Sequence, residues 1–172
     1  MEQVVNSVVK ALQLLPPAMT SPEAWVMLLA IGFQESGFKH RYQVLNNGGK
    51  GPARGFWQFE AGGGCKGVVT HAASRFWMHQ VCQKLNVPFT AKDIWNNLET
   101  NDVLAAAAAR LLLFTDPKKL PSIDDLEESW NLYNRVWRPG KPHPDRWKSS
   151  HWDGFSLYNK CCVLPQGLAT RA

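Results

Sequence analysis

The sequence predicts a mainly α-helical fold, built as one domain over residues 1–172 around a central buried helix with a small loop or β-hairpin wall. Three observations predict it: apolar residues at helical spacing in several segments, one wholly apolar segment, and a glycine-rich stretch between helices. A chain of 172 residues can bury about 70% of its unfolded surface. Only 19% of the residues are charged, which excludes a disordered polyelectrolyte.

Two helices are expected at the start of the chain. Apolar residues recur at helical spacing over residues 2–15, and the proline pair that follows ends this helix. Ser21 then offers an N-cap and Pro22 suits the first helical position, so a second helix begins there. Residues 24–33 are all apolar or glycine, and a helix that is apolar on every side belongs in the core.

The middle of the chain changes character before helices resume. Residues 37–67 are rich in Gly, Asn, Pro and aromatic residues, which indicates a loop with a short hairpin. Helical pattern returns over residues 68–85, and Thr90 with Asp93 forms a capping box before a short helix near Ile94.

Two more helices complete the predicted fold. An alanine-rich helix is expected to run from a cap at Thr100 or Asn101 to Leu113, and an Asp-Pro pair ends it. Ser122 with Asp125 is expected to begin the last helix. No repeat or linker divides the chain.

Most of the formal net charge of +5 falls in one stretch. Five Lys and Arg residues stand against one Asp between positions 135 and 148, and three prolines are expected to preclude a helix there. A basic, aromatic stretch suggests an anionic polymer or surface as partner, while the absence of a recognition helix or stacking motif argues against nucleic acid.

The remaining composition points away from secretion, membranes and metals. The first residues do not resemble a signal peptide, so synthesis in the cytoplasm is expected, and the apolar stretch 24–33 is half the length of a membrane span. The four cysteines are expected to be free thiols. His79 and Cys82 have a ligand-like spacing without a second pair, so neither a metal nor another cofactor is expected.

Glu35 is the leading catalytic candidate, because it ends the wholly apolar helix. Burial disfavours the charged form of its carboxyl group, and the negative end of the helix dipole repels it, so both effects raise its pKa. A carboxyl group with a raised pKa suits a general acid near neutral pH. The alternative is a glutamate that emerges into solvent at the helix end.

A second group of candidates lies in the run Gly55-Phe56-Trp57-Gln58-Phe59-Glu60. Aromatic rings beside a lone amide suit a sugar-binding wall, because pyranose faces stack on rings while the amide bonds hydroxyl or acetamide groups. Gly55 would let the backbone approach the ligand. The alternative is a strand with Phe56 and Trp57 in the core.

A third group is Tyr133 with Asn134 on the last predicted helix. Tyr133 lies off the apolar stripe of that helix, and its hydroxyl would need a partner such as Glu35 if it were buried. The alternative is a tyrosine on an amphipathic helix with its hydroxyl reaching solvent.

These three pieces, in this order, resemble the lytic transglycosylase and goose-type lysozyme superfamily, which cleaves the glycan strands of bacterial peptidoglycan. Gln34-Glu35-Ser36-Gly37-Phe38 is similar to its motif of a catalytic Glu followed by Ser, and Ala53–Phe59 to its Gly-Leu-Met-Gln run with aromatic replacements. Tyr133-Asn134 fits its Tyr-Asn pair, although Asn131 and Val136 stand where the family has Ala and Gly. The resemblance covers roughly residues 20–138.

The resemblance implies a lysozyme-like fold with a glycan cleft and assigns roles to these residues. Glu35 would be the general acid/base, Ser36 and Tyr133 its hydrogen-bonding supports, and Gln58 a substrate residue. The remaining expected substrate-binding residues are Gly55, Phe56, Trp57, Glu60 and Asn134.

The implied reaction is cleavage between N-acetylmuramic acid and N-acetylglucosamine with an anhydro product, as in a lytic transglycosylase. An inverting goose-type hydrolase that uses Glu35 with Glu60 is an alternative, because Glu60 stands where such lysozymes carry an Asp that positions water. A catalytically silent wall-binding virion protein is another.

The implied setting is a bacteriophage endolysin or virion enzyme, a monomer that reaches the periplasmic wall through a holin pore or in the phage particle. Its expected partner is peptidoglycan, without nucleic acid or stable membrane insertion. The basic stretch is then expected to edge the cleft, unless it is a solvated tail. The residues concerned are Arg138, Lys141, Arg146 and Lys148, with Trp147 and Trp152 for stacking.

Overall fold

The computed structural model describes residues 1–163, which contain eight α-helices and one two-stranded antiparallel sheet. The mainly helical class is therefore confirmed. The α-helices are α1 (Glu2–Gln13), α2 (Pro22–Ser36), α3 (Lys66–Thr70), α4 (Arg75–Lys84), α5 (Ala91–Asn97), α6 (Asp102–Leu113), α7 (Leu126–Trp137) and α8 (Pro144–Tyr158). The strands are β1 (Tyr42–Val44) and β2 (Lys50–Arg54), and the short irregular helices are Pro17–Met19, Ala61–Cys65 and Asn159–Val163.

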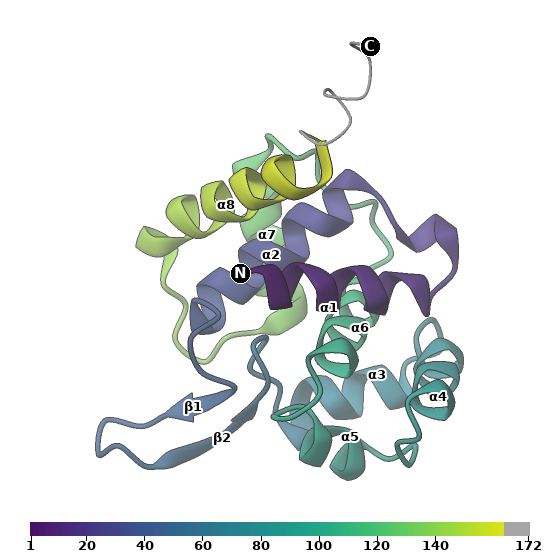
Figure 1. Ribbon diagram of the computed structural model, residues 1–172. Coiled ribbons are helices and arrows are strands. Elements are labelled where there is room, and N and C mark those ends of the chain that lie inside the picture. The colour runs from purple at the N-terminus through teal and green to yellow at the C-terminus, as the bar shows by residue number, and fades with distance from the viewer. Residues whose placement is uncertain (164–172) are drawn as a thin grey trace.

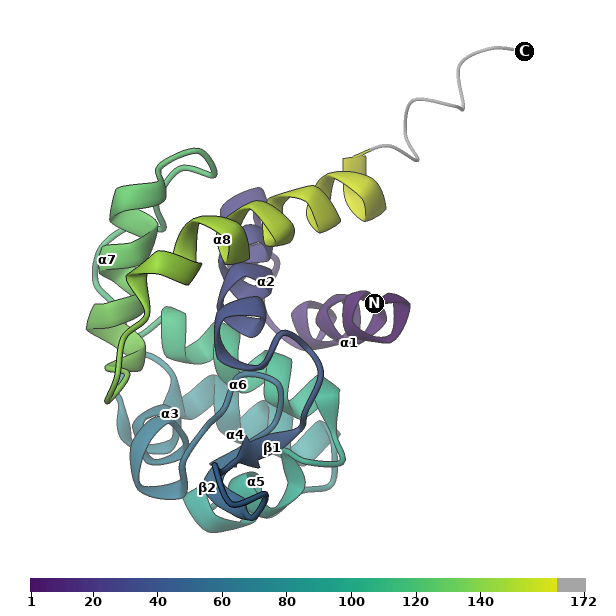
Figure 2. The same ribbon diagram turned by 90° about the vertical axis from the view of Figure 1, so that its left-hand side faces the viewer.

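The elements form two groups, as Figures 1 and 2 show. Helices α2, α7 and α8 make up one group, and α3, α4 and α5 make up the other, on the side where the β1–β2 hairpin also lies (Figure 1). Helices α1 and α6 pack against each other between the two groups. The end of α2 therefore points toward the boundary between the groups.

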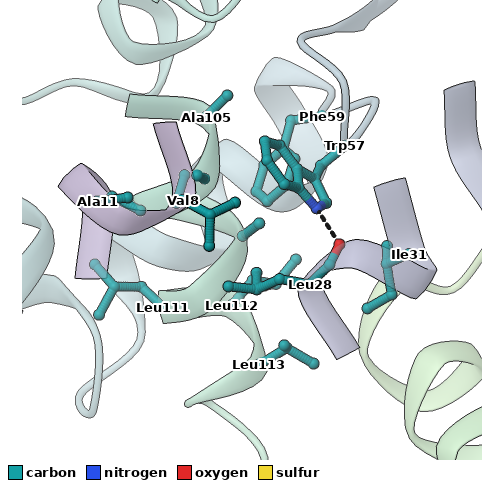
Figure 3. Packing of buried hydrophobic residues seen from close by; sticks show 14 of the residues in the cluster. Val8, Ala11, Leu28, Ile31, Trp57, Phe59, Ala105, Leu111, Leu112 and Leu113 are labelled. Atoms are coloured by element: carbon teal, nitrogen blue, oxygen red, sulfur yellow. Dashed lines mark hydrogen bonds between the residues drawn. The ribbon is translucent and has the colours of Figure 1, made fainter. Parts of the chain in front are cut away.

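The core is built around α2, as its composition predicts. Residues 24–32 are all buried. Figure 3 shows Leu28 of α2 among buried side chains of α1 and α6, with the indole of Trp57 donating a hydrogen bond of 2.8 Å to the Leu28 carbonyl. That bond satisfies the polar atom of a fully buried indole and attaches the loop after β2 to α2.

Several predicted helix starts are confirmed by their caps. The side chains of Ser21, Thr90 and Asn101 accept hydrogen bonds from the backbone N–H groups three residues later, at 3.2, 3.0 and 2.9 Å. The start predicted for α7 was wrong by three residues, because Asp125 rather than Ser122 is its N-cap. The helical pattern over residues 68–85 forms two helices, α3 and α4, separated by a turn.

The expectation that prolines preclude a helix after residue 139 was wrong for residues 144–158. Pro144 occupies the first position of α8, where the missing N–H would have had no partner in any case. Helix α8 lies along α2, and Gly154 allows this close approach: a Cβ at Gly154 would lie 2.7 Å from the Ala30 nitrogen. Residues of α8 thereby reach the end of α2.

The predicted hairpin is confirmed as β1 and β2, which pair Tyr42 with Arg54 and Val44 with Lys50. The chain turns sharply after β2, where Arg54 and Phe59 exchange two backbone hydrogen bonds of 2.9 Å. Gly55 supports this turn with a φ of 72°. The base of the hairpin and the turn bring Gln43 and Gln58 to the two cavities that Glu35 also lines.

Candidate active site

Glu35 lies in the last turn of α2, where Gly37 ends the helix in the left-handed conformation with a φ of 59°. The carboxyl group is largely removed from water, and burial raises its pKa from 4.5 to about 7. The hydrogen bond from Tyr133 and the positive charge of Arg146 act in the opposite direction and lower this pKa. A substantial fraction of Glu35 therefore stays protonated near neutral pH.

Tyr133 of α7 is the hydrogen-bond partner of Glu35. Its hydroxyl donates a 2.6 Å bond to Glu35 Oε1, and the residue is only 3% exposed. The ring stacks on Trp147 of α8 at a centroid distance of 5.0 Å and an interplanar angle of 16°. The Trp147 indole in turn donates to Leu126 O and Ser129 Oγ, both at 3.3 Å. Helices α7 and α8 thus hold the Tyr133 ring in place from behind.

Arg146 approaches the same carboxyl group from the first turn of α8. Its guanidinium donates a 3.2 Å hydrogen bond to the carbonyl of Gln34, the neighbour of Glu35. The Gln34 side chain is buried and bonds both the His143 carbonyl, at 3.0 Å, and the Ser150 hydroxyl, at 2.9 Å. This buried network fixes the start of α8 against the end of α2.

Two cavities meet at Glu35. The larger has a volume of about 1140 Å³ and extends between the glycine-rich segment 62–67 and the segment that joins α7 to α8. The smaller, of about 340 Å³, lies toward residues 36–44. Four residues line both: Glu35, Gln43, Gln58 and Arg146. The carboxyl group therefore lies where the two cavities adjoin, and we call this place the junction.

Gln58 is at this junction because of the turn after β2. Its backbone has a φ of 52°, a left-handed conformation that is uncommon for a residue other than glycine. Its amide donates a 2.9 Å hydrogen bond to the carbonyl of Gly55, which keeps the side chain within the turn. Gln58 thus lines the same cavities as Glu35, and its role as a substrate residue stays a prediction; Glu60 is exposed along the larger cavity.

The aromatic residues of the same run lie elsewhere. Phe56 is 3% exposed and Trp57 is fully buried, and neither lines the two cavities, so the prediction that they form a sugar-stacking wall was wrong. They pack in the core, although within a turn and not within a strand. Phe59 and Trp137 line the larger cavity instead, in an edge-to-face pair with centroids 5.7 Å apart.

Ser36 and Asn134 have contacts that were not expected. The Ser36 hydroxyl donates a 2.7 Å hydrogen bond to the carbonyl of Phe56, which ties α2 to the turn after β2, and it makes no hydrogen bond to Glu35. Ser36 lines the smaller cavity, so its expected place among the substrate-binding residues stays a prediction. Asn134 donates a 2.8 Å bond to the Trp130 carbonyl on its own helix, and it does not line either cavity. Gly55 is buried beneath the turn and supports it without lining a cavity.

The basic stretch divides between the cavity and other parts of the molecule. Arg138, Lys141 and Arg146 line the larger cavity, as expected. Lys148 does not line it, and the stacking role predicted for Trp147 was wrong, whereas that of Trp152 stays a prediction. Trp147 is 2% exposed behind Tyr133, and Trp152 lies on the exposed face of α8 outside both cavities.

Gln43 of β1 is a cavity residue that the sequence did not reveal. It lines both cavities, and its Oε1 is buried without a hydrogen-bond partner among the described residues. Gly51 of β2 lies directly against this amide, so that a Cβ there would collide with Oε1. A lone glutamine in a short strand carries no pattern that marks it as a site residue.

Comparison with known proteins adds no relative: no family model matches the chain, and no match is found among curated proteins or solved structures. Within residues 1–163, none of the helices combines the length and apolar character needed to cross a bilayer. The geometry around Glu35 is therefore the main evidence about function.

Proposed function

We propose that the protein is a peptidoglycan lytic transglycosylase with Glu35 as its general acid and base. The observation that carries the proposal is the buried Glu35–Tyr133 pair at the junction of two cavities, with the pKa of Glu35 near 7. A carboxyl group with such a pKa can both donate and accept a proton near neutral pH. The motifs that resemble the superfamily supply the substrate class, because one residue of each motif lies at this site: Glu35, Gln58 and Tyr133.

In the proposed reaction, Glu35 protonates the oxygen of the bond between N-acetylmuramic acid and N-acetylglucosamine. The 2-acetamido group of the muramic acid displaces the leaving sugar from the anomeric carbon. Glu35, now a carboxylate, accepts the proton of the 6-hydroxyl group as that oxygen attacks the same carbon, displaces the acetamido oxygen and forms the anhydro ring. Tyr133 holds Oε1, which leaves Oε2 to carry the proton in both steps.

The two cavities would accommodate a glycan strand on either side of the reacting bond. Gln43 and Gln58 offer amide groups at the junction, where they can bond hydroxyl or acetamide groups. Trp137, packed on the buried Phe59, adds apolar surface to the larger cavity. This arrangement agrees with a lysozyme-like fold, in which helices and a short hairpin enclose a glycan cleft.

An inverting hydrolase is the second candidate, favoured by Glu60, which lines the same cavity as Glu35. In that reaction, Glu60 would activate a water molecule that attacks the anomeric carbon while Glu35 protonates the leaving oxygen. Glu35 is the only carboxylate among the four residues at the junction, which favours the single-carboxylate mechanism.

Mass analysis of digested peptidoglycan tests this proposal. The transglycosylase predicts anhydro-muropeptides, each lighter by one water than the hydrolytic product. Reducing muropeptides that are lost in Glu60→Gln would assign the hydrolase instead. The setting that we propose is a phage lysis or wall-penetration enzyme, which reaches the periplasmic wall through a holin pore or within the particle.

A further inference from the structure

The larger cavity carries cations that the protein does not neutralise. Arg138 and Lys141 line it from the segment that joins α7 to α8, Arg146 lines it from the first turn of α8, and we call these three residues the cationic wall. Lys66 of α3 lines the same cavity. Within residues 1–163, none of these four side chains forms an ion pair. Their charges are therefore available to a bound molecule.

Arg135 differs from these four residues, because the protein neutralises its charge with carboxylates of its own. Arg135 also lines the cavity, but its guanidinium pairs with Asp116 at 2.6 Å and with Glu128 at 3.5 Å. Asp116 is thereby occupied, so Glu35 and Glu60 are the remaining carboxyl groups along this cavity. The larger cavity has an excess of positive charge and suits a ligand with several negative groups.

Both ends of the cationic wall are attached to elements of the candidate site. Its first residue, Arg138, ends α7 in the left-handed conformation with a φ of 49°, five positions after Tyr133. Its last residue, Arg146, is bonded to the Gln34 carbonyl beside Glu35. A substrate group held by the wall would therefore lie at a defined position relative to the Glu35–Tyr133 pair.

We propose that the cationic wall binds carboxylates on the side groups of the glycan, so that the enzyme selects strands that carry acidic stem peptides over neutral ones. This inference rests on the proposed function, because it identifies the feature of peptidoglycan that the larger cavity recognises. The muramic acid units bear lactyl groups and stem peptides, and the free carboxylates of those peptides supply negative charge along the strand. Chitin oligosaccharides have the same acetamido sugars without such charges.

The test compares native peptidoglycan with the same material after its free carboxylates have been converted to neutral amides. Arg138→Gln with Lys141→Gln removes two charges of the wall and leaves Arg146 in place beside Glu35. Lys148→Gln with Lys160→Gln is the matched control, because it removes the same charge from exposed positions outside both cavities. Binding is measured by co-sedimentation with Glu35→Gln in every background, and cleavage with Glu35 intact.

We expect the unmodified protein to bind and cleave native peptidoglycan about fivefold better than the amidated material. The variant with Arg138→Gln and Lys141→Gln should lose this preference, because its binding and cleavage of native peptidoglycan decrease while those of the amidated material do not change. The control pair should keep the preference. Equal activity of the unmodified protein on both materials would overturn the inference and leave the proposed function in place. A loss of preference in the control pair as large as in the wall variant would do the same. No cleavage of either material would overturn the proposed function, and the co-sedimentation preference would still decide whether the wall recognises carboxylates.

Discussion

The hydroxyl of Tyr133 donates a 2.6 Å hydrogen bond to Oε1 of Glu35, a residue 98 positions earlier in the chain. The two residues belong to different helices, α2 and α7, so the packing of the helices brings them together. The pair forms because α8 packs along α2 and places Trp147 behind the tyrosine ring. The orientation of the proposed acid thus depends on three helices.

Replacement of Tyr133 by Phe should slow peptidoglycan cleavage about tenfold, because Glu35 loses the bond that orients it. That bond also lowers the pKa of Glu35, so its removal raises the pKa further. A reaction that needs protonated Glu35 then persists to higher pH, and the alkaline limb of the pH–rate profile moves upward. Tyr158→Phe is the matched control, because Tyr158 lies against Trp25 and outside both cavities. An unchanged rate and profile in Tyr133→Phe would refute the positioning role.

The stability of the protein should depend on the protonation of Glu35. Burial raises the pKa of this residue from 4.5 to about 7, so the folded protein binds the proton more tightly than the unfolded chain. The resulting stabilisation is fully present below pH 4.5 and is lost as the pH rises through 7. Glu35→Gln, which is neutral and of the same shape, should therefore be more stable than the wild type at pH 8, by at most about 3 kcal/mol, and similar to it at pH 4.

Urea unfolding of both proteins at the two pH values measures this difference. If the difference in free energy of unfolding between the two proteins is the same at pH 4 and pH 8, whether it is large or small, the assigned burial of the carboxyl group is contradicted.

The sequence predicted those parts of the molecule that depend on local pattern. The apolar run 24–33 specifies a buried helix, and Ser21 with Pro22 marks its start, so the position of Glu35 at its end followed directly. The depth of Glu35 and its bond to Tyr133 depend on packing between distant helices. The sequence suggested Glu35 as a partner for the Tyr133 hydroxyl, but it left open whether either residue is buried and whether the bond forms.

Other features could not be inferred because one pattern permits two structures. Phe56 and Trp57 suit a sugar-binding wall as well as a core, and the Trp57–Leu28 hydrogen bond that decides between them joins distant segments. Prolines 139, 142 and 144 argue against a helix in this stretch, yet α8 begins at Pro144, because a proline is tolerated at the first position of a helix. Gln43 stands out only because its amide is buried beside Gly51 without a partner among the described residues.

Replacement of Gln43 by Leu should separate binding from stability. A buried amide oxygen without a partner is destabilising, so Leu should leave the melting temperature unchanged or raise it. The loss of the amide at the junction should nevertheless raise KM for peptidoglycan, because a bound sugar would lose its hydrogen bond. Gly51→Ala, which displaces the same amide, should also raise KM. Wild-type KM in both variants would exclude Gln43 from the substrate site.

Replacement of Gly154 by Ala should destabilise the protein and reduce its activity together. Alanine favours a helix, yet its Cβ would lie 2.7 Å from the backbone of Ala30, and the clash outweighs the gain by about 1–3 kcal/mol. Helix α8 must then move away from α2, and it carries Arg146 and Trp147 with it. Ser156→Ala is the control, since it also adds an alanine to α8, at an exposed position outside both cavities. Thermal unfolding and cleavage assays on both variants check this; equal melting temperatures would show that α8 tolerates the added methyl group.

The release of soluble muropeptides from purified peptidoglycan, compared between the wild type and Glu35→Gln, tests the central claim most directly. The account predicts anhydro-muropeptides from the wild type and a loss of at least about a hundredfold in Glu35→Gln, since the amide cannot exchange the proton. Circular dichroism should confirm that the variant remains folded. Release by a folded Glu35→Gln at the wild-type rate would contradict the role of Glu35, and no release by either protein would contradict the proposed reaction.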